Sequence, residues 1–333
     1  MRFLTELATA KPISRIGLGT WQFGSREWGY GTGYDDRVAG QIVARAADVG
    51  ITLFDTAEAY GFGRSERILG AALEARGVRE SAFIATKIFP ILPLAPIVEL
   101  RGRASAGRLG VASIDLYQVH QPNPLVSDSL TMPGMRALQD AGTVVEVGVS
   151  NYSLRRWQDA ERALGRPVLS NQVQFSLARP APLDDLVPFA AEAGRLVIAW
   201  SPLAQGLLSG RYDATHQPSG AVRRANPLFL EENLRRATGL LDALRDVAAA
   251  HDVTPAQIAL AWLLHHPNVV VIPGASKVAQ VESNAAAAEI ELTATEAGDL
   301  TAQARAFQPM PMRDTARAML ANQVGALRQR LPF

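Results

Sequence analysis

The chain contains no cysteine among its 333 residues, so disulfide bonds, thiol nucleophiles and cysteine-ligated zinc sites are excluded. Lysine is scarce and occurs only at Lys11, Lys87 and Lys277, while arginine supplies the other basic side chains. Lysine offers a compact ammonium group with an adjustable pKa, which arginine does not. We therefore expect at least some of these three positions to need that property.

A charge bias is also missing, because the net charge is only +1. This balance gives no electrostatic reason to expect a nucleic acid or an anionic membrane as partner. No apolar run approaches the ~20 residues that a membrane span needs. The first residues, Met1 to Glu6, lack the apolar core of a signal peptide, which predicts a cytoplasmic location. Composition leaves the oligomeric state open.

Several well-known functional motifs are absent. A dinucleotide-binding G-x-G-x-x-G would follow the first strand of an open sheet, but the stretches 17–22 and 61–66 both lack its third glycine. Walker A, H-E-x-x-H and G-x-S-x-G patterns do not occur either. The adjacent pair His265-His266 is a weak metal candidate at an expected helix end, and we assign it no function. We predict no metal site.

What the chain does show is a regular alternation of short apolar runs with helical patterns. The strands are expected at 16–21, 51–55, 82–87, 114–120, 144–149, 169–175, 196–200 and 269–272. The helices between and after them are expected at 35–49, 65–75, 93–109, 133–141, 154–164, 184–193, 231–249, 255–265, 278–288, 293–306 and 313–331. Eight such units predict an α/β fold, a closed (β/α)8 TIM barrel with C-terminal helices, in one domain spanning 1–333. An open doubly wound sheet is the rival.

Ionisable side chains stand where three successive strands end. Asp55 closes one apolar run, Lys87 the next and His120 the third, while Tyr60 follows Asp55 on the adjoining loop. Taken singly, each has an ordinary explanation: a helix cap, a solvated lysine, a core histidine and an amphipathic tyrosine. Because barrel enzymes keep their chemistry at the carboxyl ends of the strands, the four together predict a proton-handling site.

The sequence resembles the aldo-keto reductase family over roughly residues 14 to 290. Seven motifs occur in the family's order, and together they are far more specific than any one alone. They are the stretch from Phe54 to Gly61 (FDTAEAYG), Lys87 at its strand end, LYQVH at 116–120, GVSN at 148–151, NQVQ at 171–174, WSPLAQG at 200–206 and IPGAS at 272–276. The branch that includes bacterial aldo-keto reductases and potassium-channel β subunits looks similar.

The resemblance implies a role for each of the four ionisable residues. Tyr60 would be the general acid that protonates a carbonyl oxygen as hydride arrives from the nicotinamide. Lys87 would lower the pKa of Tyr60, which lies near 10 in an unperturbed phenol. Asp55 would hold Lys87 through an ion pair. His120 would orient the carbonyl and donate a hydrogen bond to its oxygen.

The resemblance also implies a cofactor site. Trp200 would stack on the nicotinamide ring, where many relatives use Tyr or Phe. Ser283 departs from the family, because many relatives place a glutamate there against the adenine. The residues implied in cofactor binding are Gly19, Thr20, Trp21, Asp55, Ser150, Asn151, Gln172, Trp200, Ser201, Pro202, Leu203, Gly206, Arg211, Gly274, Ser276, Lys277, Gln280 and Asn284.

The expected function is reduction of an aldehyde or ketone with NADPH. NADPH is favoured over NADH because Ser276, Lys277 and Gln280 stand at the start of the last barrel helix, with Arg223 or Arg224 on the long loop before it. The alternatives are an NAD(P)+-dependent aldose 1-dehydrogenase and a slow-turnover, cofactor-sensing regulatory subunit. The partner is a small carbonyl or sugar substrate. Its identity depends on the loops at 22–34, 88–96, 121–131 and 203–230, whose aromatics at 28–34 suit surface packing and a substrate wall equally.

Overall fold

The computed structural model describes residues 1–4, 9–218, 221–311 and 313–315. Eight parallel strands follow one another in chain order around one sheet. They are β1 (Leu18–Gly19), β2 (Leu53–Asp55), β3 (Phe83–Ile88), β4 (Ile114–Val119), β5 (Val144–Ser150), β6 (Ser170–Gln174), β7 (Leu196–Trp200) and β8 (Val269–Val271). Parallel bridges join Ile16 to Val271 and Gly19 to Gly274, so the first and last strands meet. The predicted (β/α)8 barrel is confirmed.

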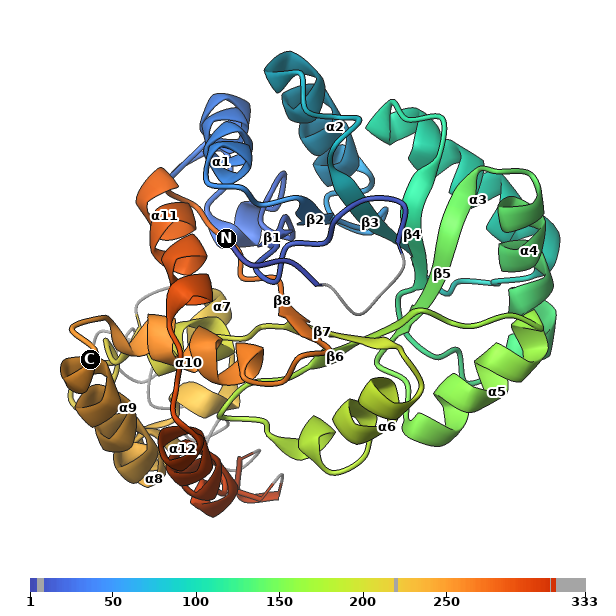
Figure 1. Ribbon diagram of the computed structural model, residues 1–333. Helices are drawn as coiled ribbons and strands as arrows, with labels where there is room; N and C mark the ends of the chain where they lie inside the picture. The colour runs from blue at the N-terminus through green and yellow to red at the C-terminus, as the bar shows by residue number, and fades with distance from the viewer. Residues whose placement is uncertain (5–8, 219–220, 312, 316–333) are drawn as a thin grey trace, which may run out of the picture.

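Helices surround the strands, as Figure 1 shows. Those that alternate with the strands are α1 (Asp36–Asp48), α2 (Arg64–Arg76), α3 (Ala95–Leu109), α4 (Asp128–Asp140), α5 (Leu154–Leu164), α6 (Leu186–Glu192), α10 (Pro255–Leu264) and α11 (Val278–Ala286). The long connection after β7 adds α7 (Ala221–Arg224), α8 (Glu231–Arg236) and α9 (Thr238–Ala250), and α12 (Ala294–Ala306) follows the barrel. Short 3-10 turns are η1 (Arg26–Trp28), η2 (Ala181–Leu183), η3 (Ala204–Ser209), η4 (Pro227–Phe229) and η5 (Ala287–Glu289).

Residues 1–4 and 9–14 lie at the amino ends of the strands (Figure 1). Phe3 pairs antiparallel with Ser14. Leu4 and Ile13 pack against Leu53, Phe83 and other residues that begin strands. Because apolar contacts close this end of the barrel, a substrate site is expected at the carboxyl ends of the strands.

Helix α4 begins five residues before the predicted start at Pro133. Its first residue is Asp128, and Pro133 lies inside the helix. At the sixth position of the helix, a proline removes the N–H that would bond the Ser129 carbonyl oxygen and crowds that carbonyl, so the helix forms at a cost that its other contacts must offset. Asp128 is held by the Tyr152 hydroxyl at 2.7 Å and by Arg156 Nε at 2.9 Å. These long-range contacts fix the helix start, and no local pattern reveals them.

Other element boundaries differ more mildly from expectation. The predicted strand at 16–21 is ordered as a strand only at Leu18–Gly19, and the predicted helix at 184–193 runs only from Leu186 to Glu192. The single helix expected at 231–249 is divided into α8 and α9 around Ala237. The helix expected at 313–331 falls almost entirely on 316–333, outside the described residues.

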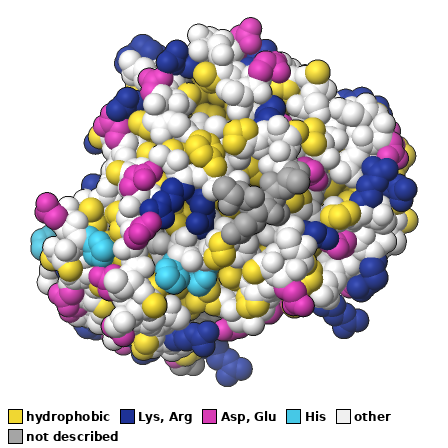
Figure 2. Space-filling model, viewed as in Figure 1, with side chains coloured by type: hydrophobic (Ala, Val, Ile, Leu, Met, Phe, Trp, Pro, Cys, Tyr) yellow, Lys and Arg dark blue, Asp and Glu magenta, His cyan; other side chains and the backbone are white. Residues whose placement is uncertain are grey.

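Basic, acidic and hydrophobic side chains are intermingled over the face shown in Figure 2. Within the described ranges, no single helix has the length and hydropathy of a membrane span, although α9 and α10, bent by 92°, pass that test as a pair. The same ranges contain no group of three or more His, Asp or Glu side chains placed to hold a metal ion.

Candidate active site

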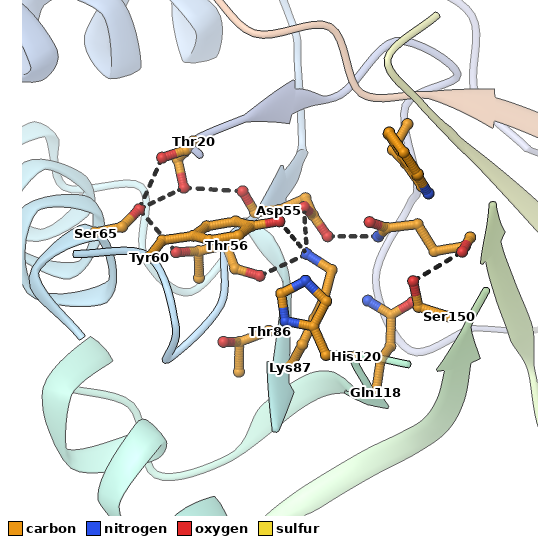
Figure 3. Close-up of polar contacts among 12 residues, drawn as sticks. Thr20, Asp55, Thr56, Tyr60, Ser65, Thr86, Lys87, Gln118, His120 and Ser150 are labelled. Atoms are coloured by element: carbon orange, nitrogen blue, oxygen red, sulfur yellow. Dashed lines mark hydrogen bonds and ion pairs between the residues drawn. The ribbon is translucent and has the colours of Figure 1, made fainter. Parts of the chain in front are cut away.

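The four predicted ionisable residues meet at the carboxyl ends of β2, β3 and β4, as Figure 3 shows. The Lys87 Nζ atom lies 2.7 Å from Asp55 Oδ1 and 3.4 Å from the Tyr60 hydroxyl. It also donates to the Thr56 carbonyl oxygen at 2.8 Å. The parallel register places Asp55 beside Ala85, two residues before Lys87, so the two side chains reach the same end of the barrel.

The ion pair is almost fully removed from water. The Lys87 side chain is 0% exposed and that of Asp55 is 3% exposed. The second carboxylate oxygen of Asp55 accepts a hydrogen bond of 2.7 Å from Gln172 Nε2, on β6. A buried pair is tolerated only when its remaining hydrogen-bonding capacity is satisfied, and Gln172 supplies that partner across the barrel. Burial lowers the pKa of Lys87, but Asp55 and Tyr60 raise it by more, so the ammonium stays protonated.

The pKa of Tyr60 is raised, whereas the resemblance implied that Lys87 lowers it. Burial raises the pKa of Tyr60, Lys87 lowers it, and the nearby Asp55 raises it again, so the balance lies above the ordinary value near 10. Lys87 therefore acts in the predicted direction without outweighing burial. The phenol is protonated at neutral pH, which is the form that can donate a proton.

His120 is a neutral imidazole at physiological pH. Burial, helped by the nearby Lys87 charge, lowers the pKa of His120 to about 3. Its ring meets the ring of Tyr60 edge-on at 5.6 Å between centroids, and that of Phe89 at 5.9 Å. Its buried Nδ1 atom has no hydrogen-bond partner among the residues that the structure describes. A neutral ring beside the phenol can orient an oxygen without adding a charge.

Three hydroxyl groups lie behind Tyr60. The Ser65 hydroxyl is 2.8 Å from the Thr20 hydroxyl and 2.9 Å from the Thr56 hydroxyl, and Thr20 Oγ1 also donates to the Asp55 carbonyl oxygen. All three are fully buried. The network ties β1, the end of β2 and the start of α2 together. The Thr20 side chain, predicted to contact cofactor, is engaged within this network.

A second group of predicted residues gathers at the ends of β5, β6 and β7. The Ser150 hydroxyl donates to the Gln172 carbonyl oxygen at 2.8 Å. Asn151, an exposed residue with a φ of 61°, receives the Trp200 indole N–H at 3.0 Å and donates to the His120 carbonyl oxygen at 3.2 Å. These bonds hold the Trp200 ring against Asn151 and tie Asn151 to the main chain of His120.

The segment after β7 adopts left-handed backbone conformations at Ser201, Ala204, Gln205 and Gly206, with φ of 52°, 48°, 56° and 101°. Such values strain residues other than glycine and cluster at functional sites. Turns of this kind present main-chain N–H groups that suit an anion. Arg223 donates from Nε to the Gln205 carbonyl oxygen at 2.8 Å, so a guanidinium lies against this turn.

The amino end of α11 holds the last predicted group. The Gln280 Oε1 atom accepts from the N–H of Ser276 at 2.8 Å and from the N–H of Lys277 at 3.2 Å. Lys277 is exposed, and Asn284 is buried one helical turn beyond Gln280. Gln280 thus occupies the helix-terminal donors that the sequence assigns to a ligand.

Two residues of this region escape the sequence analysis. Gln22 donates to the carbonyl oxygens of Ala275 at 2.7 Å and Gly19 at 3.2 Å, and so joins the first strand to the loop after the last. Glu58 lies between Asp55 and Tyr60 and binds Arg101 of α3. The Gln22 contact spans 253 residues, so no local pattern reveals it.

The structure thus brings most predicted residues to one end of the barrel, in two adjoining groups and along the loops after β7 and β8. Trp21 is 43% exposed and lies 6.3 Å from Tyr60 between ring centroids. Arg211 is exposed just beyond η3. The others lie at the carboxyl end of a strand or in the segment that follows it: Gly19 at the end of β1, Pro202 and Leu203 after β7, and Gly274 after β8.

Comparison with known proteins shows which family this chain is similar to. The model of the aldo/keto reductase family matches residues 15–304. An uncharacterized oxidoreductase of Mycobacterium tuberculosis is 59% identical over 298 residues, covering 90% of this chain and 91% of the relative.

Solved structures of family members have a similar fold. The glycerol dehydrogenase AKR11B4 from Gluconobacter oxydans is 27% identical with a TM-score of 0.83, over 93% of this chain and 97% of the other. An aldo-keto reductase from Klebsiella pneumoniae, solved in complex with NADPH, is 27% identical with a TM-score of 0.71, over 90% and 93%. The chain belongs to the aldo/keto reductase family of NAD(P)H-dependent oxidoreductases.

Proposed function

We propose that the protein reduces an aldehyde or ketone to the alcohol with NADPH, and that Tyr60 is the proton donor. The observation that carries this proposal is the position of Lys87 Nζ between Asp55 Oδ1 at 2.7 Å and the Tyr60 hydroxyl at 3.4 Å. A lysine held by one acid and aimed at one phenol stabilises the phenolate that proton donation leaves behind.

Tyr60, Lys87 and His120 divide the proton chemistry. The substrate oxygen would lie against the Tyr60 hydroxyl and the His120 ring, whose faces are nearly perpendicular at 80°. Tyr60 transfers its proton to that oxygen as negative charge develops there. Lys87 offsets the charge left on Tyr60, and Asp55 keeps Lys87 in place. His120, being neutral, donates a hydrogen bond and takes no part in proton exchange at neutral pH.

The residues gathered at this end of the barrel would suit a nicotinamide dinucleotide. A bound reduced nicotinamide supplies the hydride that the side chains cannot. Trp200 and Asn151 would hold its ring and carboxamide, with Ser150 and Gln172 behind them. The left-handed turn from Ser201 to Gly206 would hold the pyrophosphate, and Arg211 lies just beyond it. At the adenosine end, Gly274, Ser276, Lys277, Gln280 and Asn284 would form the site.

The preference for NADPH over NADH rests on charge at the amino end of α11. Exposed Lys277 would pair with the 2′-phosphate. The helix terminus favours an anion, but Gln280 already accepts from its first N–H groups. The phosphate would therefore displace the Gln280 side chain or bind outside it. Arg223 donates to the Gln205 carbonyl oxygen, so it would serve the pyrophosphate turn rather than the 2′-phosphate.

The reverse reaction is the second candidate, because the glycerol dehydrogenase from Gluconobacter oxydans shares the fold with a TM-score of 0.83. In that direction Tyr60 would act as the base, and the protonated Lys87 would keep its phenolate accessible. An aldose 1-dehydrogenase is the sugar form of the same chemistry. A cofactor-sensing subunit would bind the dinucleotide and turn over slowly.

A substrate and cofactor panel tests the proposal. NADPH oxidation is followed with aliphatic, aromatic and sugar aldehydes, and NADP+ reduction with polyols and sugars, while cofactor binding is measured in parallel. Rapid NADPH oxidation with a simple aldehyde supports the proposed function. Tight NADPH binding without turnover in either direction would support the sensor and contradict catalysis.

A further inference from the structure

Glu58 stands apart from the other residues of the Tyr60 loop, because its main chain and its side chain both bind the end of β3. Its N–H donates to the Lys87 carbonyl oxygen at 3.2 Å, and its carboxylate accepts from the N–H of Phe89. Thr56 N–H donates to Ala85 in the same way at 2.9 Å. Glu58 therefore extends the pairing with β3 beyond the last residue of β2, and its side chain supplies the acceptor for Phe89 N–H, just after β3.

Arg101 of α3 fixes that carboxylate. Its Nε donates to Glu58 Oε2 at 3.0 Å and its Nη2 to Oε1, a two-pronged contact that holds a carboxylate in one plane. The Glu58 side chain is only 11% exposed, and Arg101 Nη1 reaches onward to the Ile91 carbonyl oxygen at 3.1 Å. One guanidinium thus joins α3, the Tyr60 loop and the loop after β3.

The two loops that Glu58 and Arg101 join each carry a residue that contacts a reacting group. On one side, Tyr60 follows Glu58 by two residues, and its hydroxyl lies 3.4 Å from Lys87. That length is at the outer limit of a hydrogen bond, so a small displacement of the loop breaks it. On the other side, Phe89 packs edge-on against His120 at 5.9 Å between centroids.

We propose that Glu58, held by Arg101, is a positioning residue that fixes the Tyr60 hydroxyl against Lys87 and the Phe89 ring against His120. The inference rests on the proposed function, in which these groups deliver the proton. Glu58 does not touch the reacting atoms and acts through the loops on either side.

A second ion pair on α3 provides a matched control. Seven residues after Arg101, Arg108 Nε lies 2.5 Å from Glu66 Oε2, and the Glu66 side chain is 0% exposed. Its other oxygen accepts from the Thr86 hydroxyl at 2.6 Å. The pair is buried like the first, but its hydrogen bonds join α2, α3 and β3, whereas those of Glu58 go to the main chain at the end of β3.

The experiment compares Glu58→Ala, Glu58→Gln and Glu66→Gln. Misplacing reacting groups by a fraction of an ångström to 1 Å lowers turnover about ten- to a hundredfold, and we expect a loss in that range for Glu58→Ala. Glu58→Gln should retain more activity, because its amide oxygen still accepts from Phe89 N–H. Glu66→Gln should lower the melting temperature with little change in kcat. NADPH affinity should stay near wild type in all three.

Hydrogen exchange gives a readout that needs no turnover. Peptides covering 56–63 and 88–94 should exchange faster in Glu58→Ala than in the wild-type protein, and as slowly as wild type in Glu66→Gln. Unchanged exchange and kcat in Glu58→Ala, or equal kcat losses in Glu58→Ala and Glu66→Gln, would overturn the inference. If the wild-type protein binds NADPH but reduces no carbonyl, the proposed function fails, and the exchange data alone decide whether Glu58 holds the loops.

Discussion

A lysine–aspartate ion pair lies near each end of the barrel, and the two pairs differ in what surrounds them. At the amino end, Lys11 Nζ is 2.9 Å from Asp115 Oδ1, and the remaining partners are main-chain groups, the Ala82 carbonyl oxygen and the Ile84 N–H. At the carboxyl end, Lys87 and Asp55 are more deeply buried and share their surroundings with Tyr60. The first arrangement holds a segment in place, and the second keeps a charge beside a phenol.

The comparison distinguishes a lysine with a structural role from a lysine with a chemical role. Lys11 is 26% exposed and its pair can be screened by water, whereas Lys87 is 0% exposed and cannot. A buried ammonium influences a neighbouring phenol strongly because little solvent lies between them. Lysine thus serves a different purpose at each of these two positions.

Removing the lysine from each pair should have its most different effects on turnover. Lys87→Met removes the cation that stabilises the Tyr60 phenolate, and we expect carbonyl reduction to fall by about 10²- to 10⁴-fold. Lys11→Met removes an equivalent charge from the other end and should leave kcat nearly unchanged. Steady-state kinetics with saturating NADPH measures both, and equal losses would show that the contrast between the two ends is wrong.

The two pairs also show what the sequence can and cannot reveal. Asp55, Tyr60, Lys87 and His120 are predictable because each stands at the end of an apolar run or on the loop after it, and the barrel brings those ends together. Their pKa values are not, since the raised pKa of Tyr60 depends on burial by distant segments. The same holds for the start of α4 at Asp128, which is set by Tyr152 and Arg156.

Stability should separate the pairs less widely. Lys87→Met leaves Asp55 buried without its cation, which costs about 3–5 kcal/mol in the free energy of unfolding. The cost of Lys11→Met should be smaller, because Lys11 is partly solvated and Asp115 keeps its bond from Ile84 N–H. Asp55→Asn should be milder than Lys87→Met. Urea unfolding at pH 7 measures these differences, and a larger loss for Lys11→Met would reverse our interpretation.

Lys277, the third lysine, should have a smaller effect than Lys87, and the effect should be on the binding of a phosphate. It is exposed at the amino end of α11, and a charge-assisted contact with phosphate contributes about 1.5–3 kcal/mol. We therefore expect Lys277→Ala to weaken NADPH binding by about one to two powers of ten and NADH binding hardly at all. Fluorescence titration with both cofactors tests this. Equal weakening of the two would assign Lys277 a general role in binding.

The smallest expected effect concerns two histidines near opposite ends of the barrel. Burial lowers the pKa of His120 to about 3 and that of His266 to about 4, against about 6.5 in an unfolded chain. The unfolded state therefore binds protons first, and stability falls as pH drops below about 6.5. Each histidine should contribute about 0.8 kcal/mol of that loss between pH 7.5 and 6.

Glutamine replacements should separate the roles of these two residues. His266→Gln should reduce the stability loss between pH 7.5 and 6 without changing kcat. His120→Gln should reduce it equally while lowering kcat. Urea unfolding at the two pH values provides the test, and an unaltered pH dependence in both variants would rule out their buried neutral state.

Proton donation by Tyr60 is the central claim, and Tyr60→Phe tests it most directly. The variant keeps the ring that meets Trp21 and His120 and loses only the hydroxyl. With NADPH saturating, we predict that turnover of an aldehyde falls by about 10²- to 10⁴-fold while NADPH binding stays at the wild-type level. Near-normal aldehyde reduction by Tyr60→Phe would contradict the account.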